Sequence, residues 1–187
     1  MTDDGTAAVT LLTARLRLRP YRTADLAARA ALGAMPAVYR FTGGVPATAE
    51  ESWHRLLRYI GHWSAFGYGF FAVEARATGR FVGEAGAMDF RRGIGGGYGD
   101  VPEAGWMFVP EVHGTGIAGE AMRAVLDWLD PRQGRDGTVC MIDPDNVASQ
   151  RLAARIGYVA HGVATYHGRP LTTYVRPAGA TFATAPG

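Results

Sequence analysis

The stretch His113-Gly114-Thr115-Gly116-Ile117-Ala118-Gly119 decides most of what this sequence predicts. Glycine stands at two of its central positions, and an amphipathic helix should follow directly. A glycine-rich turn that opens a helix presents a row of backbone N–H groups at the positive end of the helix dipole. The stretch therefore predicts a loop that binds a pyrophosphate group.

Hydrophobic periodicity divides the rest of the chain into strands and helices. Before the loop it first predicts a strand over 11–19 that Pro20 ends, a helix from Thr23 to about Leu32, and a helix with Thr48 in a capping box. It then predicts strands over 69–74 and 81–90, a glycine-rich hairpin loop over 91–100, and a strand over 102–109. After the loop it predicts a helix with Ala118, Met122, Val125 and Leu129 on its buried face that Pro131 to Gly137 ends, a strand over 138–142, a helix from Asp145 or Asn146 to Gly157, and strands over 158–166 and 172–176. This order predicts a mixed α/β (α+β) domain, with a central sheet of about six to seven strands and about four helices.

Length and composition favour one globular domain. The chain has 187 residues, of which 48% are hydrophobic and 19% charged, and we expect a disordered N-terminus over 1–8, one domain over 9–177 and a flexible tail over 178–187. The net charge of +2 without a basic run argues against nucleic-acid binding. The histidines have no metal-ligand spacing, and Cys140 is the only cysteine, so we expect no metal site. With no membrane-spanning stretch and no secretion signal, the sequence favours a cytoplasmic protein.

One alternative interpretation comes from the loop itself. Residues 114–119 also satisfy G-x-G-x-x-G, the dinucleotide-binding fingerprint, and Asp143 at the end of the next predicted strand is a candidate ribose-binding acid. However, Pro110 to His113 separate the preceding strand from the loop, and the earlier strands carry the hairpin signals of an antiparallel sheet. A dinucleotide-binding protein is therefore the remote alternative.

The residues around the loop carry a resemblance to a known family. The strand from Glu103 to Val109, then Pro110 and the sequence H-G-T-G-I-A-G-E-A, resembles motif A of the GNAT acetyltransferases, in the branch of the ribosomal-protein N-terminal acetyltransferases. Residues 146–158 are similar to that branch's segment N-x-x-S-x-x-hydrophobic-x-x-basic-hydrophobic-G-aromatic. Further matches at 12–19, 82–84 and 166–170 extend the resemblance over about residues 9–177.

The resemblance implies the GNAT fold, in which the strand before the loop splays from its neighbour after Thr138 at the coenzyme A site. It also implies direct transfer of an acetyl group from acetyl-CoA to an amine, with a backbone N–H near Val109 polarising the acetyl carbonyl. The residues it implies for coenzyme A binding are Phe108, Val109, His113, Gly114, Thr115, Gly116, Ile117, Ala118, Gly119, Asn146 and Ser149.

Three residues are candidates for the catalytic chemistry. Glu103, which opens the strand beside the acetyl site, is the first candidate for the base that accepts the amine proton, and Glu84 is the second. For either one, a carboxylate that is solvated or paired with an arginine is the alternative interpretation. By the resemblance, Ser149 is the candidate that contacts the departing sulfur. Cys140, in mid-strand, is expected to be a buried and inert thiol.

Two positions depart from the family pattern. His113 stands where the family usually has Gln, Arg or a bulky aromatic residue, and Ala153 stands where many members carry a tyrosine that protonates the leaving thiolate. Trp106 faces either the core or the gap, depending on the register of its strand. These departures keep open a second interpretation, a GNAT-fold protein that binds coenzyme A without turnover, as a sensor or partner module.

The function expected from the sequence is thus an acetyl-CoA-dependent N-acetyltransferase that acts on a primary amine. The acceptor is a protein N-terminus or a small molecule, and no residue pattern decides between them. The resemblance is compatible with a homodimer, which no pattern fixes either.

Overall fold

The computed structural model describes residues 9–94, 101–133 and 137–182. The predictions for residues 1–8, for the end of the tail and for the second half of the 91–100 loop lie outside this part of the chain. Within it, an eight-stranded sheet forms the centre of the domain, with strand order β1-β2-β3-β4-β5-β6-β8-β7. The strands are β1 (Leu11–Leu12), β2 (Leu16–Pro20), β3 (Phe70–Ala75), β4 (Phe81–Met88), β5 (Glu103–Phe108), β6 (Thr138–Ile142), β7 (Val159–Tyr166) and β8 (Arg169–Arg176).

The sheet has more strands than expected because the predicted N-terminal strand is a hairpin. Thr13 makes the turn: its N–H donates to the carbonyl of Leu16 at 3.0 Å, and its hydroxyl accepts from the Leu16 N–H at 2.9 Å. The period-2 pattern correctly places Leu16 and Leu18 in the core, but Leu12 of β1 is exposed. All other predicted strands are present.

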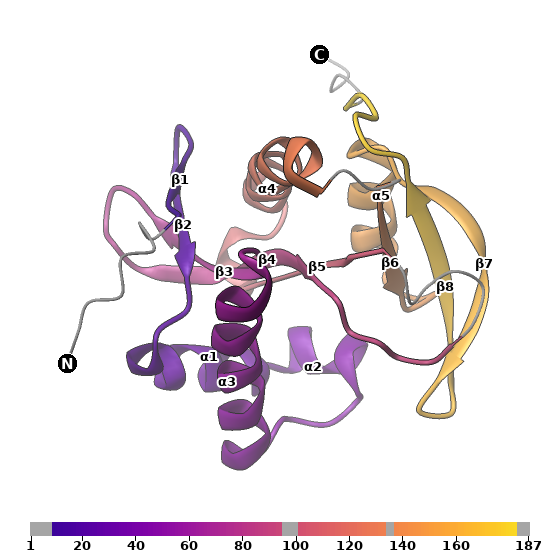
Figure 1. The fold of residues 1–187 in the computed structure, drawn as a ribbon. Coiled ribbons are helices and arrows are strands. Elements are labelled where there is room, and N and C mark those ends of the chain that lie inside the picture. The colour runs from indigo at the N-terminus through magenta and orange to yellow at the C-terminus, as the bar shows by residue number, and fades with distance from the viewer. Residues whose placement is uncertain (1–8, 95–100, 134–136, 183–187) are drawn as a thin grey trace.

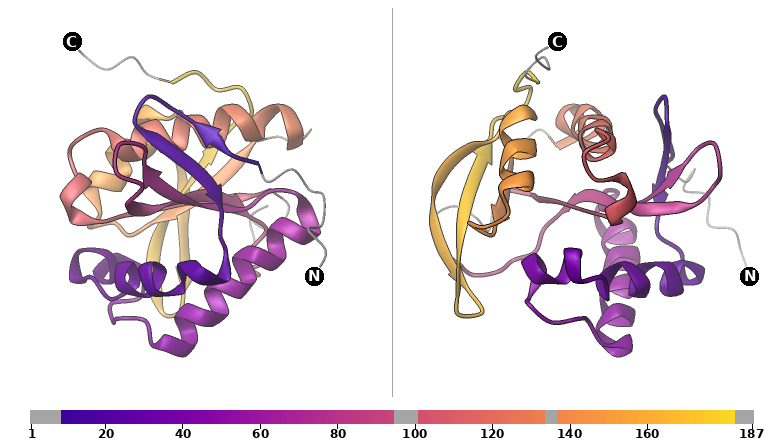
Figure 2. Two further views of the ribbon diagram at one scale, coloured as in Figure 1. Left: turned by 90° about the vertical axis from the view of Figure 1, so that its left-hand side faces the viewer. Right: turned by 180° about the vertical axis from the view of Figure 1, so that it is seen from behind.

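The described residues form five α-helices on the two faces of the sheet (Figures 1 and 2). Three of them, α1 (Leu26–Gly33), α2 (Pro36–Thr42) and α3 (Ala49–Phe66), cover one face, and α4 (Ile117–Gln133) and α5 (Val147–Arg155) cover the other. The side chains of β3 alternate accordingly: Phe71 and Val73 pack in a cluster with residues of α4, whereas Phe70 and Ala72 pack with residues of α3.

Some helix boundaries differ from the prediction. Thr23 opens a 3₁₀ turn, η1 (Thr23–Asp25), and α1 begins only at Leu26. The short helix α2, which has Pro36 in its first turn, was not predicted. Helix α4 ends at Gln133, inside the range 131–137 predicted for its end, with Pro131 in its last turn. The capping box of α3 is confirmed, since Thr48 and Glu51 exchange both expected hydrogen bonds.

The chain beyond β8 packs against the domain as far as the structure describes it. Phe182 contacts the main core cluster, and the guanidinium groups of Arg123 and Arg176 lie over its ring. Arg176 also donates to the carbonyl of Ala180 at 3.0 Å. The first part of the predicted tail, residues 178–182, is thus tied to α4 and β8. Among the described residues, no helix is both long and apolar enough to cross a membrane.

The central feature of the sheet is the divergence of β5 from β6. These two strands form the parallel pair of the sheet, and they are in register only at Glu103 and Val139. The other edge of β5, by contrast, pairs with β4 over its whole length, from Glu103 opposite Met88 to Phe108 opposite Gly83. The predicted splay after Thr138 is therefore confirmed, and it leaves one edge of β5 without a strand partner beyond Glu103.

Candidate active site

The glycine loop lies at the end of β5, immediately before α4. Gly114 and Gly116 have φ angles of +75° and +82°, in the left-handed region that glycine adopts without strain. Glu120 donates the first hydrogen bond of the helix, to the carbonyl of Gly116. The N–H groups of Ile117, Ala118 and Gly119 precede that bond, so they have no partner inside the helix.

This geometry fits the pyrophosphate of coenzyme A. Three N–H groups point out of the start of a 17-residue helix, whose dipole favours an anion at that end. A Cβ atom added to Gly114 would meet no other atom within 4 Å, so space for a ligand remains beside the loop. These N–H groups belong to the backbone, so the side chain at His113 does not change which donors the loop offers.

The glycine loop is held in place by residues of the turn between β1 and β2. The guanidinium of Arg15 donates to the Thr115 carbonyl at 2.9 Å and to Glu120 Oε2 at 2.6 Å. Glu120 also accepts from the backbone N–H of Arg15 and from the hydroxyl of Thr13. Thr115 uses its own hydroxyl on the Val112 carbonyl at 2.7 Å. The side chains of Thr115 and Glu120 therefore hold the conformation of the loop, and Arg15 neutralises the acid nearest to the anion site.

His113 fastens the loop to the end of β5. Its Nε2 lies 2.9 Å from the carbonyl oxygen of Phe108, which can only accept, so the imidazole donates this hydrogen bond. The contact closes the turn made by η2 (Pro110–Val112) between the strand and the loop. His113, which departs from the family pattern, thus helps to position the glycine loop relative to β5.

The register of β5 decides which backbone N–H near Val109 is free to polarise an acetyl group. The N–H of Val109 donates to the Val82 carbonyl at 3.0 Å, so Val109 cannot polarise a bound acetyl group. Hydrogen bonding alternates along an antiparallel pair, so residues of the opposite parity, Trp106 and Phe108, direct their N–H groups to the edge that faces β6. That edge is open, because β6 has already diverged. The N–H of Phe108 is the donor that the geometry offers in place of Val109.

A cavity of about 520 Å³ opens beside this edge. It brings together four of the residues singled out in the sequence, Glu103, Asn146, Ser149 and Trp106, from β5 and the start of α5. The other walls come from α2, α3, β3, β6, the chain after β4 and the β7–β8 hairpin, through residues that include Phe41, Arg55, Arg58, Tyr59, Phe90, Arg92, Tyr166 and Arg169. Trp106 lines the gap and also packs against the main core cluster, so it takes part in both of the environments that the sequence offered.

Glu103 lies at the point where the two strands part. Arg92 contacts both of its carboxylate oxygens, with Nε at 2.6 Å from Oε2 and Nη2 at 2.8 Å from Oε1. The guanidinium of Arg92 is itself stacked between the rings of Phe90 and Tyr166, at 4.3 and 4.5 Å from their centroids. The arginine-paired state considered as an alternative is thus present. Each oxygen keeps a further lone pair, so the carboxylate can still accept a hydrogen bond from a ligand.

Glu84 is not part of this cavity. Its side chain is fully buried in the sheet, where it accepts from the hydroxyls of Tyr21 at 2.7 Å and Tyr59 at 2.9 Å and pairs with Arg29 at 3.0 Å. Burial, together with the charge of Glu84, raises the pKa of both tyrosines, so their hydroxyls stay protonated and donate. This set of contacts joins α1 and α3 to β4. The geometry gives Glu84 a structural position rather than access to a substrate.

Ser149 and Asn146 occupy the start of α5. Asn146 caps the helix, with its side-chain oxygen accepting from the Ser149 N–H at 3.1 Å. The Ser149 hydroxyl accepts from the indole N–H of Trp106 at 3.2 Å. Since that bond uses a lone pair of the oxygen, the hydroxyl hydrogen remains available to donate to a group in the cavity.

Two further residues of the β6 end are accounted for. Cys140 is buried, as predicted, and burial together with the nearby charge of Glu103 raises the pKa of its thiol, which keeps it neutral. Asp143 pairs with Arg169 at 2.5 Å and accepts from the Asp145 N–H at 2.9 Å. These partners account for the Asp143 carboxylate, so its position does not indicate a ribose-binding acid.

Arg92 and the arginines of α3 were not singled out in the sequence. Arg92 reaches Glu103 across a glycine-rich loop, and no local pattern indicates which side chain such a loop brings back to the sheet. Among the described residues there is no group of three or more His, Cys, Asp and Glu side chains placed to hold a metal ion.

Comparison with known proteins identifies the family. The model of the acetyltransferase (GNAT) domain matches residues 15–159, so the chain belongs to the GNAT acetyltransferases. The resemblance noted in the sequence is confirmed. The dinucleotide alternative is wrong, because a Rossmann unit needs consecutive parallel strands and this sheet pairs antiparallel everywhere except between β5 and β6.

Individual relatives agree with this assignment. A solved structure from Bordetella pertussis, described as a GnaT-family acetyltransferase, is 32% identical with a TM-score of 0.79, and the match covers 90% of this chain and 99% of that one. The uncharacterized protein YkkB of Bacillus subtilis is 31% identical over 111 residues, 59% of this chain and 62% of that protein. The chain thus spans about three fifths of the length of this curated relative. RimL, a ribosomal L7/L12 alpha-N-protein acetyltransferase solved with coenzyme A, shares the fold with a TM-score of 0.73 at 17% identity, over 92% of this chain and 100% of that one.

Proposed function

We propose that this protein is an N-acetyltransferase that transfers the acetyl group of acetyl-CoA to a primary amine within a ternary complex. The observation that carries the proposal is the open edge of β5 between the glycine loop and the cavity. One end of this edge offers an anion-binding helix start, and the other offers a carboxylate and a hydroxyl. The CoA-bound RimL structure, which shares this fold, supports the choice of donor.

The backbone supplies the donor site. The N–H groups of residues 117–119 would hold the pyrophosphate, and Gly114 and Gly116 let the backbone approach it closely. The open N–H groups of Trp106 and Phe108 would pair with the pantetheine arm and the acetyl carbonyl, as a partner strand otherwise does. Asn146 fixes the start of α5 at the mouth of the cavity. Acetyl-CoA supplies the activated acetyl group.

Two side chains would manage the protons. An amine attacks only in its neutral form, so Glu103, directly or through water, accepts the proton that the amine must lose. An α-amine needs little help, because its pKa is about 8, whereas a lysine amine with a pKa of about 10.4 needs much more. On the opposite wall, the free hydroxyl hydrogen of Ser149 is placed to donate to the departing sulfur. Ala153 is fully buried and makes no contribution to the leaving group.

The proposal is tested by measuring thiol release from acetyl-CoA with a panel of primary amines. We expect turnover with at least one class of amine, and we expect E103Q to lower kcat by about 100-fold or more, the ordinary contribution of a general base. The glutamine keeps the size of the side chain and one acceptor oxygen for Arg92, while its NH2 group replaces the second acceptor. The loss should be greater for lysine-type amines than for α-amines.

Binding of coenzyme A without turnover of any amine would contradict the proposal and favour the sensor or partner module. Equal activity of E103Q and the native protein would remove Glu103 from the mechanism but leave the transferase function standing. Calorimetry with coenzyme A and with NAD separates these cases from an inactive preparation, because only a folded donor site binds coenzyme A.

A further inference from the structure

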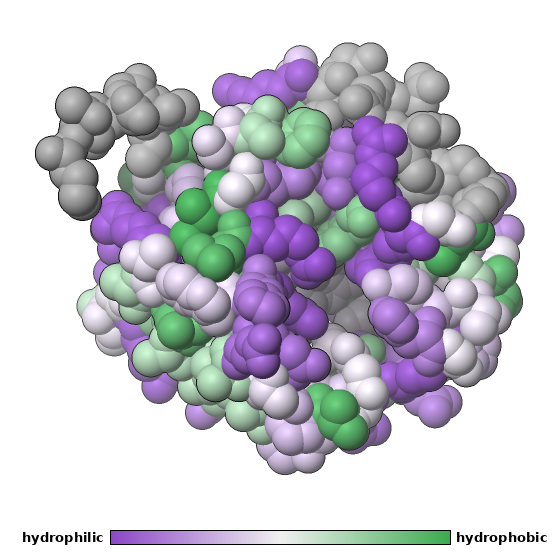
Figure 3. All heavy atoms as spheres, turned by 60° about the horizontal axis from the view of Figure 1, so that its bottom comes forward, coloured by the Kyte–Doolittle hydropathy of each residue, from purple (hydrophilic) through white to green (hydrophobic). Residues whose placement is uncertain are grey.

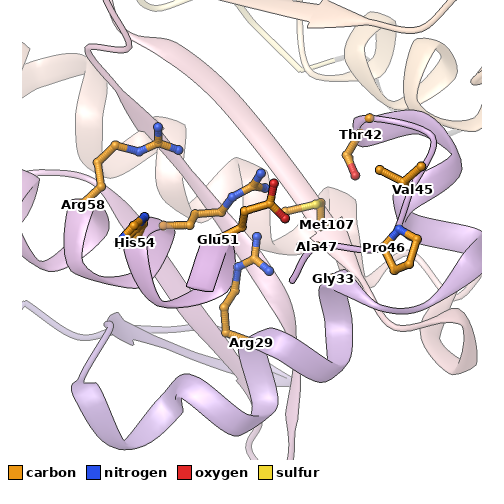
Figure 4. Close-up of a pocket in the computed structure, with 12 residues that line it drawn as sticks. Arg29, Gly33, Thr42, Val45, Pro46, Ala47, Glu51, His54, Arg58 and Met107 are labelled. Atoms are coloured by element: carbon orange, nitrogen blue, oxygen red, sulfur yellow. The ribbon is translucent and has the colours of Figure 1, made fainter. Parts of the chain in front are cut away.

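A second cavity adjoins the one that contains Glu103. It has a volume of about 450 Å³ and lies between α1, α2 and α3 (Figure 4). The two cavities share lining residues, namely Thr42, Gly43, Arg55, Arg58 and Met107. A molecule that extends away from Glu103 toward α3 therefore passes Arg55 and Arg58.

Arg55 and Arg58 form no ion pair with the described residues, although the charge of Arg55 does reach Glu51. They lie three residues apart on α3, on the same face of the helix, and neither has a carboxylate of the described residues within 4.0 Å. Burial lowers the pKa of Arg58, and the neighbouring guanidinium groups of Arg55 and Arg92 act in the same direction. Figure 3 shows hydrophilic side chains gathered around a hollow on this side of the molecule.

The acids around the two cavities are already engaged. Glu103 pairs with Arg92 and Asp143 with Arg169. Glu51 serves the cap of α3, with Oε2 at 2.7 Å from the Thr48 N–H, although the charge of Arg55 also reaches it and helps to lower its pKa. The described side chains thus leave the positive charge of α3 in excess at the boundary between the cavities.

A buried donor provides an independent observation. Arg29 is 1% exposed and lines the second cavity, and its Nη1 has no hydrogen-bond acceptor among the described residues. Its Nε lies 3.0 Å from Glu84 Oε2 as an ion pair, but this nitrogen also has no acceptor in hydrogen-bond geometry. In Figure 4 the side chain rises from α1 toward the middle of the cavity. A buried N–H group without an acceptor is costly, which indicates that an acceptor atom belongs in this space.

We propose that the amine acceptor carries a carboxylate, which binds to Arg55 and Arg58 while the amine lies beside Glu103. This inference rests on the proposed transferase function and names the class of substrate for the same site. A carboxylate satisfies planar guanidinium donors in pairs, and a partly buried pair is screened less by solvent than a surface one. Two sources supply this chemistry: a free aminocarboxylic acid, and a peptide N-terminus with an acidic side chain.

The test compares matched acceptors that differ only in this charge. One arm uses β-alanine and γ-aminobutyrate against their carboxamides, and the other uses short peptides with Asp or Glu against the same peptides with Asn or Gln. We expect kcat/KM to be about tenfold to hundredfold higher for the carboxylate member of the productive arm, the ordinary effect of one charge-assisted contact. The arm that shows the preference identifies the source.

Variants assign the preference to α3. R55Q/R58Q should reduce the ratio between the matched acceptors to about one, mainly through KM of the carboxylate, and R58Q alone should reduce it in part. Arg80 is exposed in the β3–β4 turn and away from both cavities, so R80Q is the matched control and should retain the ratio. Unchanged affinity for coenzyme A shows that the variants fold.

The outcomes separate the two proposals. If the native protein releases no thiol with any amine, the transferase function itself is overturned. If it turns over but treats carboxylates and carboxamides alike, or if R55Q/R58Q keeps the preference, the acceptor class proposed here is wrong and the transferase function stands.

Discussion

At the scale of single residues, the site depends on side chains whose partners fix which of their atoms remain free. Ser149 is the clearest case, because the Trp106 indole and the Asn146 cap determine its orientation. The indole N–H can only donate, so the serine oxygen must accept, and its hydrogen is left for the cavity. The direction of this hydrogen bond is what makes Ser149 a candidate donor rather than an ordinary residue of the first helical turn.

The first prediction concerns this hydroxyl. S149A should lower kcat by about tenfold to hundredfold, because a hydrogen bond to a developing thiolate is lost, while KM for acetyl-CoA stays nearly constant. Steady-state kinetics by thiol release measures both constants. Ser64 is exposed on α3, and S64A is the matched control. A fall in S149A that appears in KM and not in kcat would show that Ser149 binds the donor and does not assist the leaving group.

At this scale the sequence predicts residue identity better than residue environment. Glu103 and Ser149, the catalytic candidates of the sequence, both line one cavity, while their catalytic roles stay predictions. The burial of Arg29 in an alanine-rich helix was not predictable, because its partner Glu84 lies on a distant strand. The same holds for Arg92 and Glu103, which stand eleven positions apart in the sequence without a local pattern that predicts their pairing.

At the scale of elements, the glycine loop and the register of β5 divide the work of binding between them. The loop turns through left-handed conformations at Gly114 and Gly116 and so exposes the start of α4. The register decides which N–H groups of β5 face the opening. If the register shifted by one residue, the N–H of Val109 would face the opening in place of the N–H of Phe108. The Trp106 side chain would then turn to the other face of the sheet.

The second prediction compares two glycines that both have room for a side chain but differ in backbone conformation. Gly114 has φ of +75° and Gly61 lies inside α3, and an added Cβ meets nothing within 4 Å at either position. G114A should destabilise the fold by about 1–2 kcal/mol through left-handed strain and weaken coenzyme A binding. G61A should stabilise the helix by about 0.5–1 kcal/mol.

Urea unfolding gives both free energies, and calorimetry with coenzyme A gives the affinity. An increase in stability for G114A would mean that the loop does not hold the left-handed conformation in solution. The comparison is independent of catalysis, so it tests the cradle even where the acceptor is unknown.

Elements with strong local signals were predictable, and elements defined by long-range pairing were not. The α3 capping box and the glycine turn are local, and both are confirmed. The hairpin at Thr13 divides an alternation that looks continuous in the sequence, because the turn is made by a threonine rather than by glycine or proline. Helix α2 is too short for its periodicity to stand out.

At the scale of the whole molecule, two helical layers enclose the sheet, and a buried polar cluster joins one of them to it. Glu84 of β4 receives Arg29 from α1, Tyr59 from α3 and Tyr21 from the chain after β2. The Arg29 and Glu84 side chains are 1% and 0% exposed, so neither charge is hydrated and each depends on the other.

The third prediction follows from this dependence. R29M should destabilise the fold by about 3–5 kcal/mol, because it leaves a buried carboxylate without its cation. R29M/E84Q should be less destabilised than R29M, since the glutamine removes the charge, its oxygen accepts from one tyrosine and its NH2 group donates to the hydroxyl of the other. The midpoints of urea unfolding measure the series, with exposed R80M as the control. If the double variant proved less stable than R29M, the charge of Glu84 would not be the source of the cost.

The parting of β5 from β6 has a thermodynamic consequence for ligand uptake. Where a sheet is continuous, an extended guest must compete with hydrogen bonds that the host already makes. Here the two strands meet in register at one pair only, so a guest that slides between them gains backbone partners without displacing any. The strands are already apart in the folded protein, so the opening is preorganised when the guest arrives.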